Sequence, residues 1–116
     1  MLLVNGKEIK SSISMPKAID CVAKGFSDFN DGLFSMPQRS IMDIKGATVL
    51  TMPAYRKDGE YFVIKVVTVF DNFSIKKDKI VNSSVLVFDS KTGNLLAKLD
   101  GDSITAIRTG AASGIA

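Results

Sequence analysis

The sequence predicts a mixed α/β (α+β) fold: a largely antiparallel sheet of about five to six strands, an amphipathic helix packed on it, and a second helix at the C-terminus. Three observations support this prediction. Residues 61–70 (YFVIKVVTVF) are apolar on both alternate faces, which is typical of an interior strand. Residues 15–30 repeat apolar residues at helical spacing. Polar, glycine-containing turns separate the other apolar runs, and a length of 116 residues suits one domain.

The N-terminal segments are predicted to be a short strand at residues 1–4 and a brief helix or an irregular lead-in at residues 7–13. A longer helix is predicted over residues 15–30, because Ser14 is a suitable N-cap and Pro16 is tolerated in the first turn. We expect its apolar stripe to cover one face of the sheet. The stripe consists of Ile19, Val22, Phe26 and Phe29. The residues expected to face water are Asp20, Lys24 and Asp28.

The next segments are predicted to build the first half of the sheet. Residues 40–44 are expected to form an edge strand, because Pro37 favours an extended conformation in the residue before it. A hairpin then joins residues 47–52 to the strand at 61–70, with the Asp58-Gly59 pair as its turn.

The second half of the sheet is predicted to be another strand pair. Residues 71–79 are expected to form a solvated loop, in which Lys76, Lys77 and Lys79 accompany Asp78. Strands are predicted over residues 81–88 and 95–99. The turn between them contains Gly93, where we expect a positive φ.

The C-terminal stretch predicts a helix over residues 104–116, capped by residues 100–103. Most of its residues are small, and Gly110 and Gly114 each cost roughly 1 kcal/mol relative to alanine in a helix interior. Close approach by another backbone would compensate for this cost. No earlier segment is an obvious partner, and no residue caps the helix at its end. We therefore expect the polypeptide to be truncated within a longer protein.

Lys65 is unusual because it lies in the middle of the apolar strand. An ammonium taken out of water is unfavourable unless it is paired or neutralised. Three explanations are open: a side chain that reaches solvent at the rim of the sheet, a buried ion pair with a carboxylate, or a site for an anion or carbonyl group.

Composition excludes several kinds of chemistry. The chain has no histidine, so it supplies no histidine base, Ser-His-Asp triad or histidine metal ligand, and we expect no metal site. The phosphate-binding patterns GxxxxGK[ST] and GxGxxG are absent. A net charge of +3 without an aromatic-basic patch gives no sign of a nucleic-acid partner. One cysteine and no signal peptide or membrane span indicate a cytoplasmic protein without a membrane partner.

Five stretches resemble the N-terminal half of the ornithine cyclodeaminase/mu-crystallin family, and together they span nearly the whole chain. These are MPQR at 36–39, MPAY at 52–55, IKVVTVF at 64–70, VLVFDSKTGNLLAKLDG at 85–101 and ITAIRTGAASGIA at 104–116.

The resemblance implies an NAD(P)-dependent enzyme of amino acid metabolism. Family members catalyse ammonia-releasing cyclisation of ornithine (a lyase reaction) or related oxidoreductions of amino and imino acids. We therefore expect the complete protein to be an ornithine cyclodeaminase-like enzyme that acts on an amino or imino acid. Arg39, Lys65 and Arg108 would bind the substrate, with Lys65 as the catalytic residue, and Arg108 and Thr109 would meet the NAD or NADP cofactor. The resemblance further implies a homodimer formed through the sheet, and a separate dinucleotide-binding domain downstream. We therefore expect these 116 residues to be inactive alone and to bind no cofactor tightly.

The sequence departs from the family pattern at two places, one of which is expected to contact the nicotinamide cofactor. Relatives often have Pro-Thr ahead of the third strand, with the threonine near the nicotinamide, where this chain has Lys79-Ile80. Ser83 or Ser84 could replace that threonine. A proline that usually follows the central strand is replaced by Asp71.

Two alternatives to the enzyme are open. One is a mu-crystallin-like binding protein or a dimerisation module without catalysis. The other is an unrelated small β-rich domain in which Lys65 pairs with a carboxylate and lies far from Arg39 and Arg108.

Overall fold

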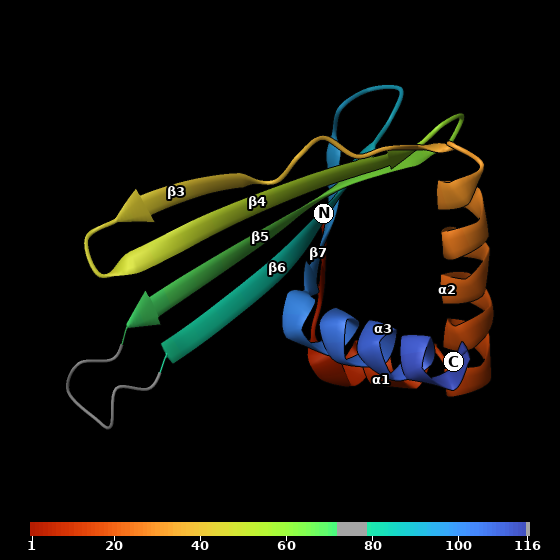
Figure 1. Ribbon diagram of the computed structural model, residues 1–116, viewed down its shortest axis with the longest axis horizontal. Coiled ribbons are helices and arrows are strands. Elements are labelled where there is room, and N and C mark those ends of the chain that lie inside the picture. The colour runs from red at the N-terminus through yellow and green to blue at the C-terminus, as the bar shows by residue number, and fades with distance from the viewer. Residues whose placement is uncertain (72–78, 116) are drawn as a thin grey trace.

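A computed structural model of the chain describes residues 1–71 and 79–115. Within these residues the chain forms one seven-stranded sheet and three helices (Figure 1). The elements are β1 (Leu2–Val4), α1 (Gly6–Ser12), α2 (Met15–Asn30), β2 (Phe34–Ser35), β3 (Ser40–Ile44), β4 (Ala47–Arg56), β5 (Tyr61–Asp71), β6 (Lys79–Asp89), β7 (Leu95–Asp100) and α3 (Gly101–Ile115). The predicted fold class is confirmed. The predicted loop over 71–79 falls largely outside the described residues.

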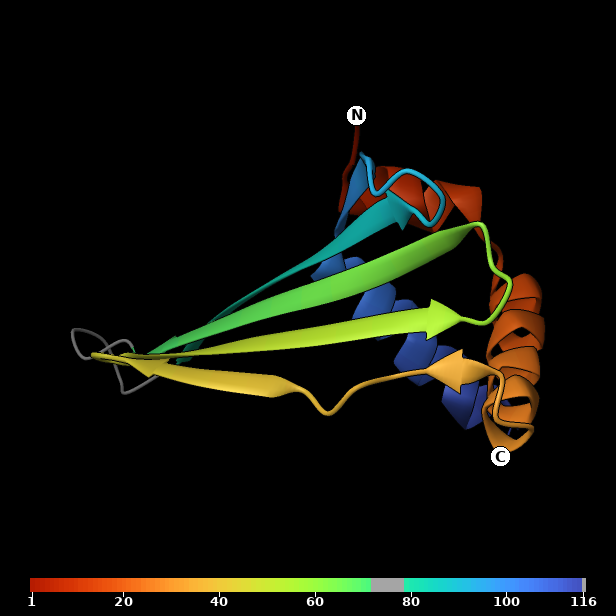
Figure 2. The same cartoon turned by 90° about the horizontal axis from the view of Figure 1, so that it is seen from above.

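The strands follow the order β1-β7-β6-β5-β4-β2, and β3 also pairs with β4. Only the β1–β7 pair is parallel among the described strands. The sheet has more strands than expected because the two residues of β2 pair separately with the end of β4. Figure 2 shows the long strands extending away from the helices. One end of the sheet is therefore uncovered in the isolated chain.

The register of β5 defines two apolar faces. Lys65 lies opposite Met52 of β4 and Val85 of β6, so these three side chains share one face, called here the Lys65 face. The other face, called the Phe62 face, contains Phe62 stacked on Phe88, with ring centroids 4.8 Å apart. The prediction of an interior strand with two apolar faces is confirmed.

The edge of the sheet is interrupted between β2 and β3. Pairing with β4 stops at Ser35–Tyr55 and resumes at Ser40–Thr51. Pro37 and Pro53 lie within the interrupted stretches. Proline has no N–H to donate to a neighbouring strand, which explains why the edge pairing is absent there. Figure 2 shows the chain leaving the sheet edge between β2 and β3.

Two capped helices form the N-terminal part. Asn5 Oδ1 accepts a hydrogen bond from the Glu8 backbone N–H at 2.9 Å, and the Glu8 carboxylate accepts one from the Asn5 N–H at 3.3 Å. This capping box starts α1, so the segment left open in the prediction is helical. Ser14 caps α2 by accepting a hydrogen bond from the Lys17 N–H. The bounds predicted for α2 are confirmed.

The prediction that the α2 stripe covers the sheet needs correction, because α2 packs chiefly on α3. A Cβ added at Gly114 would lie 2.7 Å from Ile19 Cδ1, and one at Gly110 would lie 3.3 Å from Met15 Cε. The glycines of α3 therefore allow α2 to approach closely, and α2 is the partner that the sequence did not reveal. Phe26 and Phe29, at the other end of the stripe, are exposed.

Asp28 was expected to face water, and this expectation is wrong. The residue is only 9% exposed. Its Oδ2 accepts hydrogen bonds from Arg56 Nε at 3.0 Å and from Lys24 Nζ at 3.2 Å. The side-chain hydrogen bond from Arg56 is the main reason that the pKa of Asp28 lies below its usual value. The helical pattern placed Asp28 on the polar side, but it could not show that β4 brings an arginine to this position.

The remaining boundaries differ little from the predictions. Asp58 has the positive φ (63°) in the β4–β5 turn, and Gly93 has φ 76° as expected. Helix α3 begins at Gly101, three residues earlier than predicted, because Asp100 serves as its cap. No helix in the described part of the chain is long and apolar enough to cross a membrane.

Candidate functional site

Lys65 contacts the C-terminal helix. Its Nζ donates a hydrogen bond to Thr105 Oγ1 of α3 at 2.6 Å. Val63 and Val67 lie two residues away on the same face of β5, and Met52 and Val85 are the cross-strand neighbours. All four neighbours in the sheet are apolar, so the threonine hydroxyl is the polar group that α3 brings to the ammonium.

Lys65 has no ion pair with a described side chain. Among the side chains of residues 1–70 and 80–114, the basic nitrogens within 4.0 Å of a carboxylate belong to Lys24 and Arg56, and both contact Asp28. Lys65 is half-buried and has a hydroxyl partner in place of a carboxylate. Two of its three N–H groups are thus left for other acceptors. The two remaining explanations are a side chain that reaches solvent and a site for an anion.

Arg108 lies on α3 one turn beyond Thr105. Residues three positions apart in a helix lie on the same face, so Arg108 is placed on the side of α3 that contacts Lys65. Arg108 and Thr109 are both exposed. A guanidinium and a neighbouring hydroxyl on an exposed helix face suit phosphate or carboxylate oxygens. These residues therefore suit an anionic ligand.

Arg39 lies at the edge of the sheet, at about the same position along the strands as Lys65. It immediately precedes Ser40, which pairs with Thr51, and Thr51 in turn pairs with Val66 beside Lys65. Two strand spacings separate β3 from β5, which is roughly 10 Å between backbones. Arg39 is exposed and lies at the end of the interrupted edge. The side chains of an arginine and a lysine are long enough for both to contact one small anion at this separation.

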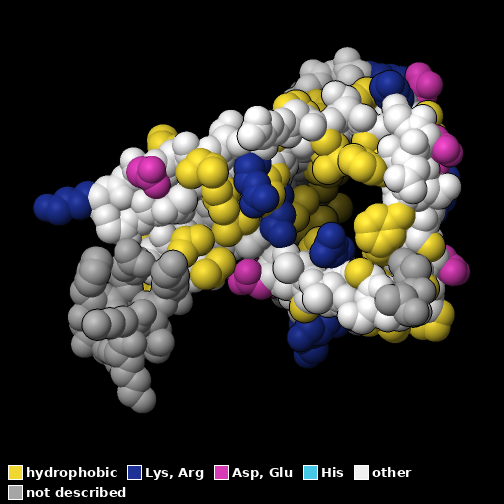
Figure 3. All heavy atoms as spheres, in the orientation of Figure 1, with side chains coloured by type: hydrophobic (Ala, Val, Ile, Leu, Met, Phe, Trp, Pro, Cys, Tyr) yellow, Lys and Arg dark blue, Asp and Glu magenta, His cyan; other side chains and the backbone are white. Residues whose placement is uncertain are grey.

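The three cations predicted from the sequence therefore come from the sheet edge, the sheet centre and the middle of α3. Figure 3 shows Lys and Arg side chains over the sheet beside a hollow that opens toward α2 and α3, whereas several acidic side chains lie on the outer side of α2. Neighbouring cations repel one another, and a bound anion removes that repulsion.

Ser83 and Ser84, the two candidates for the missing cofactor threonine, lie on different faces. Ser83 pairs with Val67 and shares the Lys65 face, whereas Ser84 pairs with Val66 on the Phe62 face. Ser83 Oγ is buried against Gly101 and has no hydrogen-bond partner in the described part of the chain. Ile80 is half-exposed and belongs to the Phe62 face. Ser83 therefore shares the face of Lys65, whereas Ser84 shares the face of Ile80, the position that the threonine occupies in relatives.

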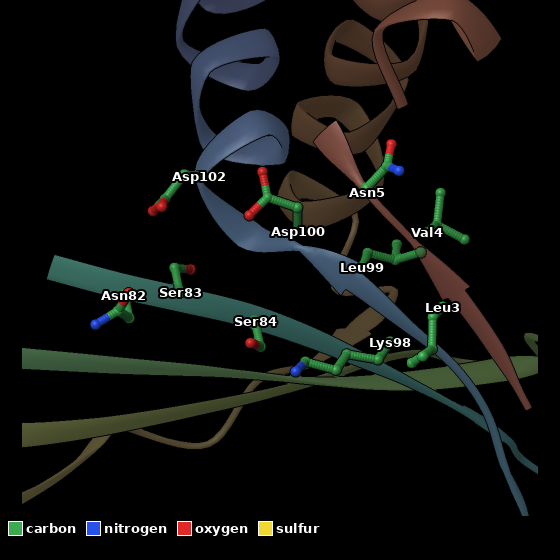
Figure 4. A pocket seen from close by; sticks show the side chains of 10 residues that line it. All are labelled: Leu3, Val4, Asn5, Asn82, Ser83, Ser84, Lys98, Leu99, Asp100 and Asp102. Carbon is green, nitrogen blue, oxygen red and sulfur yellow. The ribbon is translucent and has the colours of Figure 1, made fainter. Parts of the chain in front are cut away.

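A polar groove of about 540 Å³ lies where β7 leaves the sheet (Figure 4). Asp100 and Asp102 line it at the start of α3, together with Asn82 and Lys98. Asp100 Oδ2 accepts hydrogen bonds from Ser103 Oγ at 2.6 Å and from Ser103 N at 3.2 Å. These two bonds are the main reason that the pKa of Asp100 lies below its usual value. The groove does not include Lys65, and the role of Asp100 is to cap α3.

Thr105 is the contact that sequence analysis missed. It was one of several small residues in a helix with weak amphipathic character, and nothing in the sequence pairs it with a strand 40 positions away. Its spacing from Arg108 is a signal that could have identified it, because a hydroxyl and a guanidinium three residues apart share a helix face.

Comparison with known proteins shows which family and which relatives the chain is similar to. The sequence pattern of the ornithine cyclodeaminase/mu-crystallin family matches residues 1–116. A Delta(1)-pyrroline-2-carboxylate reductase from Bacillus thuringiensis subsp. konkukian is 34% identical over 125 residues, covering 100% of this chain and 36% of the relative.

Two solved structures have the same fold. One is the Thermococcus litoralis Delta(1)-pyrroline-2-carboxylate reductase in complex with NADH and L-proline, with a TM-score of 0.84 and 37% identity. The other is an archaeal alanine dehydrogenase dimer with bound NAD, with a TM-score of 0.83 and 28% identity. Each comparison covers 100% of this chain and 36% of the other chain. The chain thus spans about a third of the length of the relatives that it matches.

Proposed function

Because the chain belongs to the ornithine cyclodeaminase/mu-crystallin family, we propose that the complete protein is an NAD(P)-dependent reductase of a small imino acid. The observation that carries this proposal is the position of Lys65: its ammonium points at α3, one turn from Arg108, without a carboxylate partner in the described residues. A pyrroline-2-carboxylate reductase that binds NADH and L-proline has the same fold over the whole of this chain.

In the proposed site, Arg39 and Arg108 hold the substrate carboxylate from opposite sides. A guanidinium offers paired N–H groups that match a carboxylate, and exposure of both arginines leaves them accessible. The carboxylate is then fixed near the Lys65 ammonium. Lys65 can donate a hydrogen bond to the carboxylate or to the substrate nitrogen, and it can transfer a proton there.

The cofactor is proposed to lie on the exposed side of α3, where Arg108 and Thr109 provide a cation and a hydroxyl. When bound, the nicotinamide supplies or accepts the hydride at the α-carbon. The role of this chain is to orient the substrate and to hold a proton donor near its nitrogen. We expect residues 1–116 alone to bind a carboxylate and to show no turnover.

Reduction is favoured over cyclisation of ornithine for this protein. Both reactions need a carboxylate site and a proton donor near a nitrogen on the α-carbon, so the geometry of Lys65 suits either. Relatives with 34% and 37% identity include pyrroline-2-carboxylate reductases, and the rat protein that is also 34% identical is a ketimine reductase mu-crystallin. The family also offers a second candidate, a binding protein without catalysis.

The test is to assay the complete protein with Δ1-pyrroline-2-carboxylate and NADH or NADPH, and separately with ornithine. We expect NAD(P)H oxidation only with the cyclic imine. Lys65→Met should weaken L-proline binding roughly 10- to 100-fold, the usual effect of losing a hydrogen bond to a charged group. Lys98→Met is a matched control, because Lys98 is exposed and pairs with Leu86 on the Phe62 face.

The outcomes separate the candidate functions. Ammonia release from ornithine without imine reduction would favour a cyclodeaminase. Tight binding of L-proline without turnover of either substrate would favour a binding protein. Equal binding by wild type and Lys65→Met would contradict the proposed site itself.

A further inference from the structure

The contact between Lys65 and Thr105 joins the central strand of the sheet to α3. At 2.6 Å, the Nζ–Oγ1 distance is short even for a hydrogen bond from a charged donor. The two residues are 40 positions apart, and the Lys65 side chain is half-buried. Thr105 is exposed on the same helix face as Arg108. A ligand held by Arg108 would therefore also lie close to this pair.

One hydrogen bond to Thr105 limits the orientations that the Lys65 ammonium can adopt. A lysine side chain has four rotatable bonds and carries about 2 kcal/mol of rotamer entropy, so an unrestrained ammonium samples many positions. With one N–H held by the hydroxyl, the two others have fixed directions. The cost of ordering the lysine is then met before a ligand binds, which raises affinity.

The position of Thr105 is itself fixed by close packing of α3. A Cβ at Gly101 would lie 2.6 Å from the backbone carbonyl carbon of Ser83, so this end of the helix sits directly on β6. Gly110 and Gly114 are in close contact with side chains of α2. Asp100 caps the first turn. Helix α3 therefore holds the hydroxyl at a defined place above β5.

We propose that Thr105 is a positioning residue that fixes the Lys65 ammonium so that its two remaining N–H groups face an anion bound between Lys65 and Arg108. This inference deepens the proposed function and rests on it for the identity of that anion, a small imino or amino acid carboxylate. Thr105 acts through Lys65, because its hydroxyl already accepts a hydrogen bond from that ammonium.

The first test measures the lysine directly and does not depend on catalysis. In the complete protein, side-chain ¹⁵N NMR of Lys65 should show an ordered ammonium with slow proton exchange. Thr105→Val keeps the shape and removes the hydroxyl, so we expect a more mobile ammonium and faster exchange. Thr105→Ser keeps the hydroxyl and should restore the wild-type signal. An unchanged Lys65 signal in Thr105→Val would overturn the proposal.

The second test asks whether the effect passes through Lys65. Calorimetric titration of the NADH-bound protein with L-proline should give a Kd about tenfold higher for Thr105→Val and near wild type for Thr105→Ser. In a Lys65→Met background, Thr105→Val should have no further effect. The melting temperature of each variant is measured as well, because a lowered value would indicate a general loss of packing.

The two tests distinguish failure of this inference from failure of the proposed function. Equal tenfold losses in both backgrounds would overturn the positioning role, even if wild type reduces the imine. If wild type neither binds L-proline nor reduces the imine, the proposed function fails, and the NMR comparison alone decides whether Thr105 orders Lys65.

Discussion

The carboxylate of Asp28 connects the helices to the edge of the sheet. It lies near the end of α2, is largely buried, and accepts hydrogen bonds from Arg56 of β4 and Lys24 of α2. Burying a carboxylate is unfavourable unless it is paired, so the two basic side chains are needed for this position to be stable. The ion pair between Asp28 and Arg56 therefore holds the end of α2 beside β4 and near the segment that leads to Arg39.

The pKa of Asp28 leads to a prediction about pH. The carboxyl titrates below its usual pKa in the folded protein, mainly because Arg56 hydrogen-bonds its charged form. Its contribution to stability is therefore present above the unfolded pKa of about 4 and is lost as pH falls through the lower folded pKa. We expect Asp28→Asn to lower the melting temperature at neutral pH and to reduce the loss of melting temperature on acidification.

Thermal unfolding of wild type and Asp28→Asn from about pH 7 to about pH 3 would measure this effect. Some acid sensitivity should persist in the variant, because the pKa of Asp100 is also lowered. Asp20→Asn is the control, since Asp20 is exposed on the same helix. Parallel pH curves for wild type and Asp28→Asn would show that the ion pair contributes nothing.

Single residues were predictable where local context was sufficient. Lys65 was identified because a charge within an apolar strand needs an explanation, whatever the fold. Thr105 and Asp28 were missed or misplaced because their partners lie 40 and 28 positions away. Helical periodicity gives the direction of a side chain from its own helix, and it carries no information about what another element brings there.

Among the elements, α3 decides whether the candidate site is formed. It follows β7 without a linker, its first residue is packed against β6, and its small residues lie against α2. The two glycines weaken the helix itself, and close packing on α2 compensates for that cost. Thr105 and Arg108 depend on this placement to reach the Lys65 face.

Gly101→Ala should therefore affect both stability and ligand binding. The added Cβ would lie 2.6 Å from backbone of Ser83, which cannot move aside easily, so we expect a loss of about 1–3 kcal/mol in the free energy of unfolding. Displacement of α3 should also weaken L-proline binding. Urea unfolding and calorimetry would measure the two effects.

Gly25→Ala is a matched control within α2. Nothing lies within 4 Å of a Cβ at Gly25, so alanine should stabilise the protein by roughly 0.5–1 kcal/mol through helix propensity. Ligand binding should be unchanged. Wild-type stability in Gly101→Ala would mean that α3 can move away from β6 at no cost.

Most elements could be predicted because their signals are local. Ser14 and Pro16 marked the start of α2, and the Asp58-Gly59 pair marked the turn before β5. Strand β2 has two residues and no pattern of its own, since it exists only through pairing with β4. The packing of α2 on α3 was missed because the glycine face of α3 gives no hydrophobic signal.

At the scale of the whole molecule, the sheet extends beyond the helices that cover it (Figures 1 and 2). Every residue of β3 is exposed. Large apolar side chains are exposed at this end of the sheet on both faces. They are Ile41, Met42, Ile44, Phe70, Ile80 and Val81. Exposed apolar patches with an open strand edge are typical of surfaces that another chain covers.

We propose that the Phe62 face at this end of the sheet, which contains Met42, Ile44, Phe70 and Ile80, forms a homodimer interface, as the resemblance implies for the family. A related alanine dehydrogenase structure is a dimer. The apolar residues of β5 predicted a strand buried on both faces, but within the described residues the helices contact the sheet chiefly at β6 and β7. Sequence patterns cannot distinguish burial within a chain from burial between chains, because both select apolar side chains.

Met42→Lys tests this interface, because Met42 is 56% exposed at the edge strand and lies on the Phe62 face. A lysine there must leave water if a partner covers the face. We therefore expect the dissociation constant of the dimer to rise at least tenfold. Asp43→Lys is the control, since it adds a lysine at the next position on the opposite face. Sedimentation equilibrium of the complete protein would measure both variants.

A wild-type protein that is monomeric at all concentrations would contradict the proposed dimer. Equal weakening of the dimer by both variants would show that added charge at the edge matters more than the face. Arg39 lies next to β3, so loss of the interface should also disturb the position of Arg39. We therefore expect Met42→Lys to weaken L-proline binding although the Lys65 side chain is unaltered.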